Sequence, residues 1–316
     1  MTVRVADAPR VSLFSGPTPV EEMSRLRAVL GGRGVPRLLV KRDDAISFGF
    51  GGNKVRKLEF ALADAMAHGA DTIVTLGGVQ SNHARATAAA AAKLGLKCVL
   101  IINGTPPERP TANALLDRLL GAEIEYIPSR NERVEAGERV MARLAGQGRT
   151  PFLLPLGAST PVGALGFVDA VGELVGQGIR PDVIVHACSS GGTQAGLVAG
   201  AEIHGLTARI IGVSADDPAA DVATTVRRIV RGIDGLASFD GDVEVDDTRV
   251  GDGYGFPTDA SREAQQIFAR TEALFVDHTY TAKAAGALIS SVRERRFAPD
   301  QTVLFWHTGG QVGLFA

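Results

Sequence analysis

The chain alternates short apolar runs with longer stretches in which apolar residues recur every three or four positions. The short runs predict buried β-strands, and the longer stretches predict amphipathic α-helices. Strands are predicted at Arg37–Lys41, Thr72–Leu76, Lys97–Ile102, Glu123–Ile127, Phe152–Leu154, Val183–His186, Arg209–Val213 and Thr302–Trp306. Helices are predicted at Glu21–Leu30, Leu58–His68, Ser81–Leu94, Ala112–Leu120, Arg130–Leu144, Val162–Gly176, Thr193–Gly205, Ala219–Ile233, Ser261–Arg270 and Ala282–Arg295, with residues 240–259 irregular. Because helices and strands alternate, we expect an α/β fold with open, mainly parallel sheets.

Composition narrows the functional classes. The 316 residues are 45% hydrophobic and 22% charged, which is typical of globular proteins and predicts roughly two domains. The net charge of -2 and the lack of a dense basic tract argue against nucleic acid or an anionic membrane as the partner. The two cysteines, Cys98 and Cys188, provide neither a disulfide framework nor a cysteine metal site, and no metal is expected. Since no apolar stretch has the length of a signal peptide or membrane span, we expect a cytoplasmic protein that acts on small molecules.

The segment GGNKVRKLEF, residues 51–60, places a lysine directly after a glycine pair. Glycines permit tight turns, so Lys54 is expected at a loop-to-helix junction, where a reactive amine can face a cleft. The alternative is that Lys54, Arg56 and Lys57 form a solvated basic cluster at the start of an exposed helix. For Arg56 and Lys57 we expect this solvated position; for Lys54 the choice depends on the rest of the chain.

Two further strand-to-helix junctions are rich in small polar residues. In TLGGVQSNHARATAAAAAKLGL, residues 75–96, Ser81 or Asn82 could simply be a helix N-cap, although such junctions also bind anions in open α/β sheets. In VIVHACSSGGTQAGL, residues 183–197, the loop between strand and helix suits a monophosphate group better than the P-loop or dinucleotide patterns. An ordinary small-residue turn is the alternative for this loop, which contains Ser190, Gly191, Gly192 and Thr193.

Two of the three tyrosines lie in irregular segments late in the chain. Tyr254 belongs to GDGYGFPT and Tyr280 to VDHTYTAKAAG, and Thr308 follows in FWHTGG. A loop tyrosine usually only packs its ring, so neither carries an argument alone. A lysine amine, a phosphate cradle and polar strand ends are together the set expected for pyridoxal 5'-phosphate, whose aldehyde forms a Schiff base with lysine.

The same segments resemble the fold-type II pyridoxal-phosphate enzymes of the tryptophan synthase β-like superfamily. Within it, the chain is similar to the family of 1-aminocyclopropane-1-carboxylate deaminases and D-cysteine desulfhydrases. GGNKVRKLEF, GGVQSNHARATAAAAAKLG, SSGGTQAGL, YGFPT and HTGG occur in the family's order over nearly the whole chain, and the first two together are highly specific. Ser189 departs from the pattern, because the family often has glycine there.

This resemblance implies a role for each matching residue. Lys54 would be the Schiff-base lysine and the base that handles the α-proton, with Ser81 beside the substrate carboxylate as nucleophile or orienting group. Asn82 would hydrogen-bond the cofactor's ring hydroxyl, and Tyr254 and Tyr280 would be the two active-site tyrosines. The remaining cofactor-binding residues would be Ser190, Gly191, Gly192, Thr193, Thr281 and Thr308.

Two positions favour one activity within the family. In the resembling family, members that open a cyclopropane ring have glutamate where this chain has Thr281 and leucine where it has Thr308. A carboxylate near the pyridine nitrogen keeps that nitrogen protonated and the ring a strong electron sink, whereas threonine supplies no charge. The resemblance therefore implies α,β-elimination on a small amino acid, with D-cysteine giving pyruvate, ammonia and hydrogen sulfide. Alternatives are 1-aminocyclopropane-1-carboxylate deamination, a lyase for L-cysteate or β-chloroalanine, a pyridoxal-phosphate carrier or sensor, and an unrelated nucleotide-binding protein.

The resemblance also implies the organisation of the chain. We expect two open twisted sheets with the cofactor in the cleft between them. Residues 57–167 would form a smaller inserted α/β domain, and residues 1–56 and 168–316 would form a larger cofactor-binding domain. A homodimer is expected from the family alone.

Overall fold

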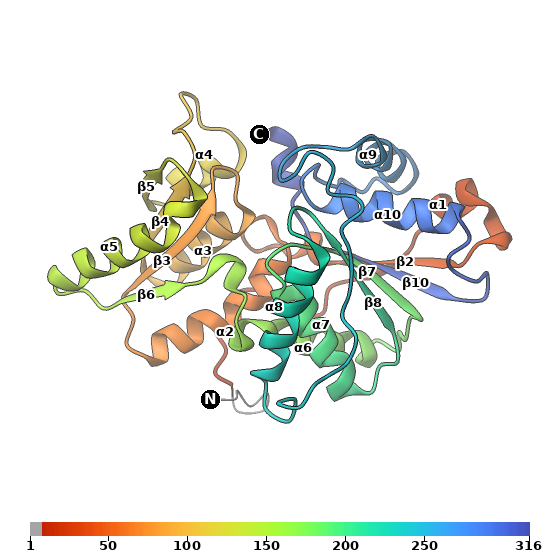
Figure 1. Ribbon diagram of the computed structural model, residues 1–316, viewed down its shortest axis with the longest axis horizontal. Helices are drawn as coiled ribbons and strands as arrows, with labels where there is room; N and C mark the ends of the chain where they lie inside the picture. The colour runs from red at the N-terminus through yellow and green to blue at the C-terminus, as the bar shows by residue number, and fades with distance from the viewer. Residues whose placement is uncertain (1–7) are drawn as a thin grey trace.

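The computed structural model describes residues 8–316, which form two β-sheets, each with helices on both faces (Figure 1). The larger sheet has the strand order β1 (Val20–Glu22), β2 (Arg37–Arg42), β10 (Thr302–His307), β7 (Val183–Cys188), β8 (Arg209–Ser214) and β9 (Glu244–Asp246). The smaller sheet has the order β5 (Glu123–Ile127), β4 (Lys97–Asn103), β3 (Thr72–Gly78) and β6 (Pro151–Leu154). In these two sheets every neighbouring pair is parallel except β1 and β2.

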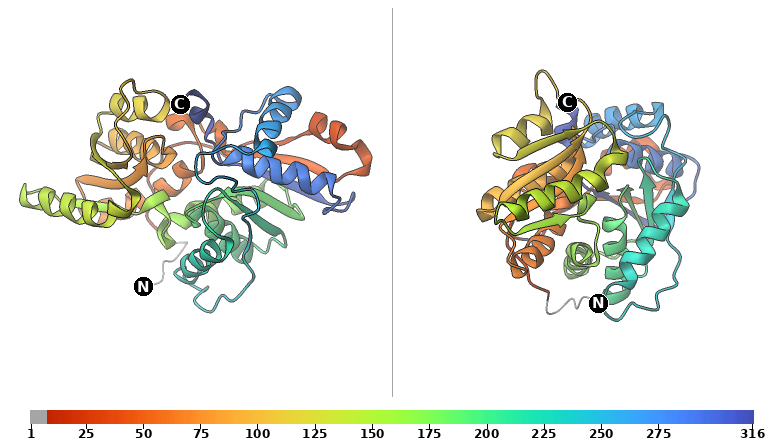
Figure 2. Two further views of the ribbon diagram at one scale, coloured as in Figure 1. Left: turned by 45° about the horizontal axis from the view of Figure 1, so that its top comes forward. Right: turned by 60° about the vertical axis from the view of Figure 1, so that its left-hand side comes forward.

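Helices bury the apolar faces of both sheets. The larger sheet carries α6 (Pro161–Gly176), α7 (Gly192–His204) and α8 (Ala219–Arg231) on one face and α1 (Ser24–Leu30), α9 (Asp259–Glu272) and α10 (Thr281–Arg293) on the other. The smaller sheet packs against α2 (Asn53–Ala67), α3 (Asn82–Leu94), α4 (Ala112–Leu119) and α5 (Arg133–Gly146). Helix α2 also packs on α6 and thereby joins the two sheets, which lie side by side in Figure 1 and in the left-hand view of Figure 2. Short 3-10 turns are η1 (Gly32–Gly34), η2 (Asp43–Ala45), η3 (Phe48–Phe50), η4 (Arg130–Glu132), η5 (Leu156–Ala158) and η6 (Gln311–Phe315).

The expected fold class is confirmed, and each predicted strand is present. Two local predictions are wrong. Residues 20–22 form β1 rather than the start of a helix, because Val20 pairs antiparallel with Lys41. Residues 240–259 are not wholly irregular, since Glu244–Asp246 pairs with β8. In both cases a contact with a distant strand overrides the local pattern.

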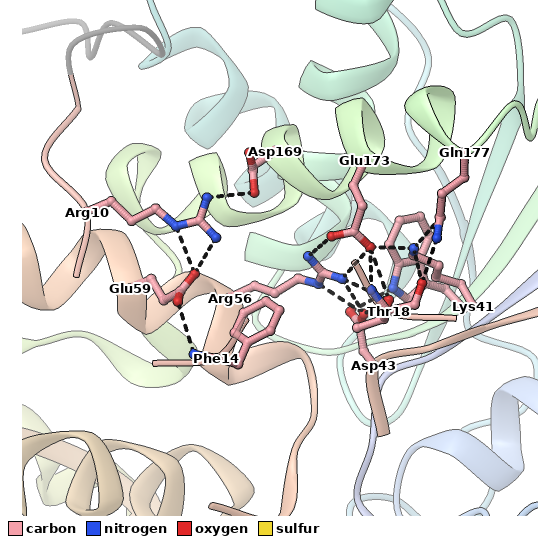
Figure 3. Close-up of polar contacts among 11 residues, drawn as sticks. Arg10, Phe14, Thr18, Lys41, Asp43, Arg56, Glu59, Asp169, Glu173 and Gln177 are labelled. Atoms are coloured by element: carbon pink, nitrogen blue, oxygen red, sulfur yellow. Dashed lines mark hydrogen bonds and ion pairs between the residues drawn. The ribbon is translucent and has the colours of Figure 1, made fainter. Parts of the chain in front are cut away.

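The expectation that Arg56 and Lys57 are solvated is also wrong. Their exposed fractions are 1% and 0%, because α2 is covered by both the smaller sheet and α6. Arg56 lies between two carboxylates, Asp43 at 2.8 Å and Glu173 at 3.0 Å (Figure 3). A buried arginine is stable only when such partners satisfy its charge and its donors.

Asp43 is the acceptor at the centre of this network. One carboxylate oxygen accepts hydrogen bonds from Arg56 and from the hydroxyl of Thr18 at 3.0 Å, and the other accepts one from the indole of Trp306 at 2.8 Å. Lys41, fully buried on β2, donates to Glu173 on α6 and to Gln177 at 2.7 Å (Figure 3). The network therefore ties β2, α2, α6 and β10 together.

We expect Asp43→Asn to lower the free energy of unfolding by about 3–5 kcal/mol, because it leaves the buried guanidinium of Arg56 without its full countercharge. The measurement is urea denaturation followed by circular dichroism. Glu22→Gln removes the exposed pair with Arg37 and is the matched control, with a loss of about 1 kcal/mol or less. Equal losses in the two variants would contradict the central role of Asp43.

Candidate active site

A cavity of about 240 Å³ lies at the carboxyl ends of strands from both sheets. Gly78 ends β3, Ser189 follows β7, Asp216 follows β8 and Thr308 follows β10, and all four line it. In open parallel sheets this edge is where ligands bind, because loops and helix N-termini converge there.

Lys54 lies in the first turn of α2 and lines this cavity. Its amine is 3.3 Å from the side-chain oxygen of Asn53. Burial lowers the pKa of Lys54 from 10.5 to about 8, so a much larger share of the amine is neutral near neutral pH than in an exposed lysine. A neutral amine is the form that attacks a carbonyl and accepts a proton.

Two glycine loops hold this lysine in place by a close backbone approach. Gly52 has φ 97°, and a Cβ atom on it would lie 2.9 Å from the carbonyl oxygen of Thr308. The amide of Asn53 donates to that same carbonyl at 3.0 Å. A larger residue than glycine would push the GGNK loop away from the HTGG loop and displace Lys54.

The loop after β7 presents hydroxyls and backbone amides at the N-terminus of α7. Ser190 and Thr193 line the cavity, and the hydroxyl of Thr193 accepts from the side-chain amide nitrogen of Asn53 at 2.8 Å. Gly191 has φ 76°, a conformation that glycine adopts without strain. Ser159 supports the loop, since its hydroxyl is 2.8 Å from that of Ser190 and accepts from the Gly192 amide. A helix N-terminus with such donors favours an anion.

Lys57 adds a buried amine without a hydrogen-bond partner near Cys188, just before this loop. Its amine is buried and makes no hydrogen bond within the part of the chain that the structure describes. Burial and the charge of Lys54 lower the pKa of Lys57 well below its usual value, and Lys57 also acts on the thiol of Cys188 at the end of β7. A phosphate in the loop would supply the missing acceptor and countercharge.

Ser81 and Asn82 start α3 on another wall of the cavity. Ser81 is the N-cap of α3, because its hydroxyl accepts from the Ala84 amide at 3.2 Å. Ser81 also lines the cavity, so it can cap the helix and face a ligand. The Asn113 amide donates to the side-chain oxygen of Asn82 at 2.9 Å. This bond fixes the orientation of the Asn82 side chain and leaves its amide nitrogen free to donate.

The two tyrosines meet over the cavity. The hydroxyls of Tyr254 and Tyr280 are 2.6 Å apart, and their rings pack edge to face. Burial raises the pKa of both, that of Tyr280 well above its usual value. Both hydroxyls are therefore protonated at neutral pH. Because one of them donates to the other, the pair offers a ligand one hydroxyl donor.

Two predicted cofactor-binding residues do not line the cavity. The hydroxyl and amide of Thr281 donate to Asp277 at 2.7 and 3.0 Å, and Thr281 is fully buried. Gly192 faces Ser159, where a Cβ atom would lie 2.6 Å from the hydroxyl oxygen. Direct contact of either residue with a ligand is therefore not supported. The other predicted residues all line the cavity, namely Lys54, Ser81, Asn82, Ser190, Gly191, Thr193, Tyr254, Tyr280 and Thr308.

Sequence reasoning missed Lys57, Asn113 and Ser159. Lys57 carried a usable signal, because it lies three residues after Lys54 and therefore on the same side of the helix. Asn113 lies in the first turn of α4 and Ser159 follows η5, both far from Lys54 in the sequence, and nothing local marks them.

Comparison with known proteins identifies the family. Residues 11–309 match the family model described as pyridoxal-phosphate dependent enzyme. This chain belongs to the pyridoxal-phosphate dependent enzymes. The D-cysteine desulfhydrase of Salmonella typhi is 38% identical to this pyridoxal-phosphate enzyme, covering 98% of the chain and 96% of the relative.

Solved structures agree with this assignment. The crystal structure of an ACC deaminase homologue is 34% identical and superposes with a TM-score of 0.90, covering 98% of this enzyme and 94% of that chain. The processed form of threonine deaminase isoform 2 from Solanum lycopersicum, at 16% identity, 93% and 79% coverage and a TM-score of 0.67, shares the fold. The alternative of an unrelated nucleotide-binding protein is therefore wrong.

The residues of this pyridoxal-phosphate enzyme fit the cofactor. The lowered pKa of the Lys54 amine suits its aldehyde, and the Ser190–Thr193 loop with the unpaired Lys57 suits its phosphate. The free amide donor of Asn82 suits its ring oxygen.

We expect borohydride reduction of the enzyme with pyridoxal phosphate to attach the cofactor to Lys54. Because the pKa of Lys54 is about 8, the rate of attachment should rise with pH and level off above about 8, below the value for an exposed lysine. Peptide mass spectrometry locates the label. Lys54→Ala should lose it, whereas Lys57→Met should keep it while binding the cofactor more weakly. A label on Lys57 instead of Lys54 would show that Lys57 is the lysine that bonds the cofactor.

We expect Asn113→Ala to weaken cofactor binding by roughly 5- to 30-fold, because Asn82 loses the bond that orients its amide. Fluorescence titration of the cofactor measures this. Asn82→Ala and the Asn82→Ala/Asn113→Ala double variant complete a double-mutant cycle. The double variant should bind the cofactor no more weakly than Asn82→Ala alone. Additive losses would show that Asn113 acts independently of Asn82.

Proposed function

We propose that the enzyme catalyses α,β-elimination on a small amino acid with a β leaving group, with D-cysteine giving pyruvate, ammonia and hydrogen sulfide. The observation that carries this is a lysine amine of lowered pKa in a cavity shared with an anion-binding loop and two protonated tyrosines. Relatives named D-cysteine desulfhydrase, at 38% identity over nearly the full chain, support the choice of substrate. A carrier or sensor without turnover is disfavoured, since these relatives are enzymes.

Bound pyridoxal phosphate supplies an aldehyde that joins an amine and a ring that accepts the electrons released at the α-carbon. The chain's own groups then have separate tasks. Ser81 and the N-terminus of α3 bind the substrate carboxylate, since the helix end attracts an anion. Lys54 takes the α-proton, the bond between the β-carbon and sulfur breaks, and sulfur leaves with the electron pair. One tyrosine hydroxyl of the Tyr254–Tyr280 pair donates to the other, so the pair has one O–H left to donate toward the leaving group. Water converts the remaining aminoacrylate to pyruvate and ammonia.

The alternative is deamination of 1-aminocyclopropane-1-carboxylate, and the structure of the ACC deaminase homologue keeps it open. Opening a carbon ring demands a stronger electron sink than expelling a thiolate. Thr308 lines the cavity and carries no charge, and Asp277 is fully hydrogen-bonded behind Gly310. Among the described residues, the lack of a lining carboxylate at the β10 end argues for elimination.

We also propose that the enzyme is a cytoplasmic homodimer. Apolar side chains are exposed on two packed elements, Leu119 on α4 and Phe315 on η6, with exposed fractions of 73% and 76%. A second copy would cover such a face. Within residues 8–316 we find no helix of a length and apolarity that would span a membrane, and both cysteines are free and buried.

We expect D-cysteine to yield equal amounts of pyruvate and sulfide, while 1-aminocyclopropane-1-carboxylate yields little 2-oxobutanoate. Lactate dehydrogenase coupling and a sulfide assay measure the products, with L-cysteine, L-cysteate and β-chloro-D-alanine in the same panel. Lys54→Ala is the control and should release neither product. Faster turnover of the cyclopropane acid than of D-cysteine would overturn the proposal.

A further inference from the structure

Lys283 is a buried amine whose three hydrogen bonds all go to backbone carbonyls. It is the third residue of α10 and is 1% exposed. Its amine donates to the carbonyl oxygens of Ala215 at 3.0 Å, Val250 at 2.8 Å and Gly253 at 2.9 Å. An ammonium group has three hydrogens and no acceptor, so these three carbonyls use every donor. The amine therefore acts on the chain itself and has no hydrogen left for a ligand.

Helix stability does not explain a cation at this position. The N-terminal turn of a helix carries a partial positive charge, so a lysine in the first turn of α10 is unfavourable there. Burial lowers the pKa of Lys283, and the charges of Asp216 and Asp277 only partly offset this effect. A buried cation is costly unless its donors are satisfied, so the three carbonyls are what allow Lys283 to lie here.

Two of these carbonyls belong to the loop that carries Tyr254. This loop, residues 247–258, runs from β9 to α9, and three of its residues are glycines with φ between 63° and 112°. Its turns are closed by backbone hydrogen bonds of 3.3 to 3.4 Å, which are longer than the two bonds from Lys283. Glycine has the largest backbone freedom, so a loop of this composition depends on an anchor outside itself to keep one conformation.

Helix α10 also places the partner of Tyr254. Tyr280 is the N-cap of α10, where its amide donates to Asp277 at 2.9 Å, and its hydroxyl lies 2.6 Å from that of Tyr254. Lys283, three residues later, binds the residue directly before Tyr254. One helix terminus therefore fixes both members of the pair, Tyr280 through its backbone and Tyr254 through Lys283.

The third carbonyl extends this anchor to the end of β8. Ala215 directly follows β8 and precedes Asp216, which lines the cavity and whose charge acts on both tyrosines. Because one ammonium group binds both segments, the end of β8 and the loop of Tyr254 keep a fixed position relative to each other.

We propose that Lys283 is a positioning residue, which holds the loop of Tyr254 over the cavity so that the tyrosine pair forms and presents its free O–H to the leaving group. This inference rests on the proposed function for the role of the pair and adds the residue that assembles it. Without Lys283, the three carbonyls lose their common donor and the loop moves away from Tyr280. A departing thiolate needs this hydrogen-bond donor more than a departing chloride does, because chloride is a far weaker base.

Fluorine NMR of the holoenzyme labelled with fluorotyrosine tests the placement without turnover. The chain has three tyrosines, so three resonances are expected, and single substitutions by phenylalanine assign them. Tyr254→Phe gives the position of the Tyr280 resonance without its partner, and we expect Lys283→Met to move that resonance to the same position. Leu288→Ala is the matched control, since it removes a fully buried side chain from the same helix, destabilises the fold and keeps the amine. Its Tyr280 resonance should stay at the wild-type position.

Turnover by the holoenzyme tests the consequence for the leaving group. The quantity is the ratio of kcat/KM for D-cysteine to that for β-chloro-D-alanine. We expect Lys283→Met and Tyr254→Phe each to lower this ratio about 10- to 100-fold, and the double variant to lower it no further than Tyr254→Phe alone. Leu288→Ala should keep the wild-type ratio, because a smaller share of folded enzyme slows both substrates alike. Should circular dichroism show that Lys283→Met is unfolded, Lys283→Gln, which keeps an amide donor, takes its place with an expected loss of about 3- to 10-fold.

The outcomes distinguish the two proposals. A Tyr280 resonance at the wild-type position in the Lys283 variant, or equal losses of kcat/KM for the two substrates, overturns the role of Lys283 while elimination stands. Failure of the wild type to release pyruvate from either substrate overturns the proposed function. A moved Tyr280 resonance then still supports Lys283 as the residue that places Tyr254.

Discussion

The buried contact between Arg56 and Asp43 is the constraint on which the active site depends. Arg56 lies two residues after Lys54, and Trp306, which donates to the same carboxylate, lies two residues before Thr308. One buried carboxylate thus holds two segments from opposite ends of the chain. Its own backbone carbonyl accepts from the Gly52 amide at 2.8 Å, which adds the glycine loop to the same support. The lysine is placed by charges that take no part in the chemistry.

The buried basic side chains fall into two groups: those paired with carboxylates of the fold and those without a partner beside the cavity. Arg56 and Lys41 are buried with carboxylate partners, whereas Lys57 is buried beside the cavity with no partner among the described residues. The cost of burying an unpaired amine is met when an anion binds. The low pKa of Lys54 follows mainly from burial, which outweighs the attraction of Asp277.

The sequence could predict what depends on short-range pattern. Strands, the glycine turn before Lys54 and the N-cap position of Ser81 follow from local rules and were foreseeable. The burial of Arg56 was not, because it depends on Asp43, Thr18 and Glu173 arriving from three other segments. For the same reason β9 escaped prediction, as only its pairing with β8 makes three residues a strand.

Thr281 shows how a family pattern and a structure combine. The pattern placed an uncharged residue where a carboxylate would strengthen the electron sink, and it took Thr281 to contact the cofactor. In the structure the hydroxyl of Thr281 instead donates to Asp277, a buried carboxylate whose oxygens accept from three amides and that hydroxyl. These four hydrogen bonds occupy both carboxylate oxygens of Asp277, which packs against Gly310. The cavity wall at Thr308 therefore remains uncharged. Thr308, rather than Thr281, is the residue that faces the ligand there, and it supplies no charge that would strengthen the electron sink.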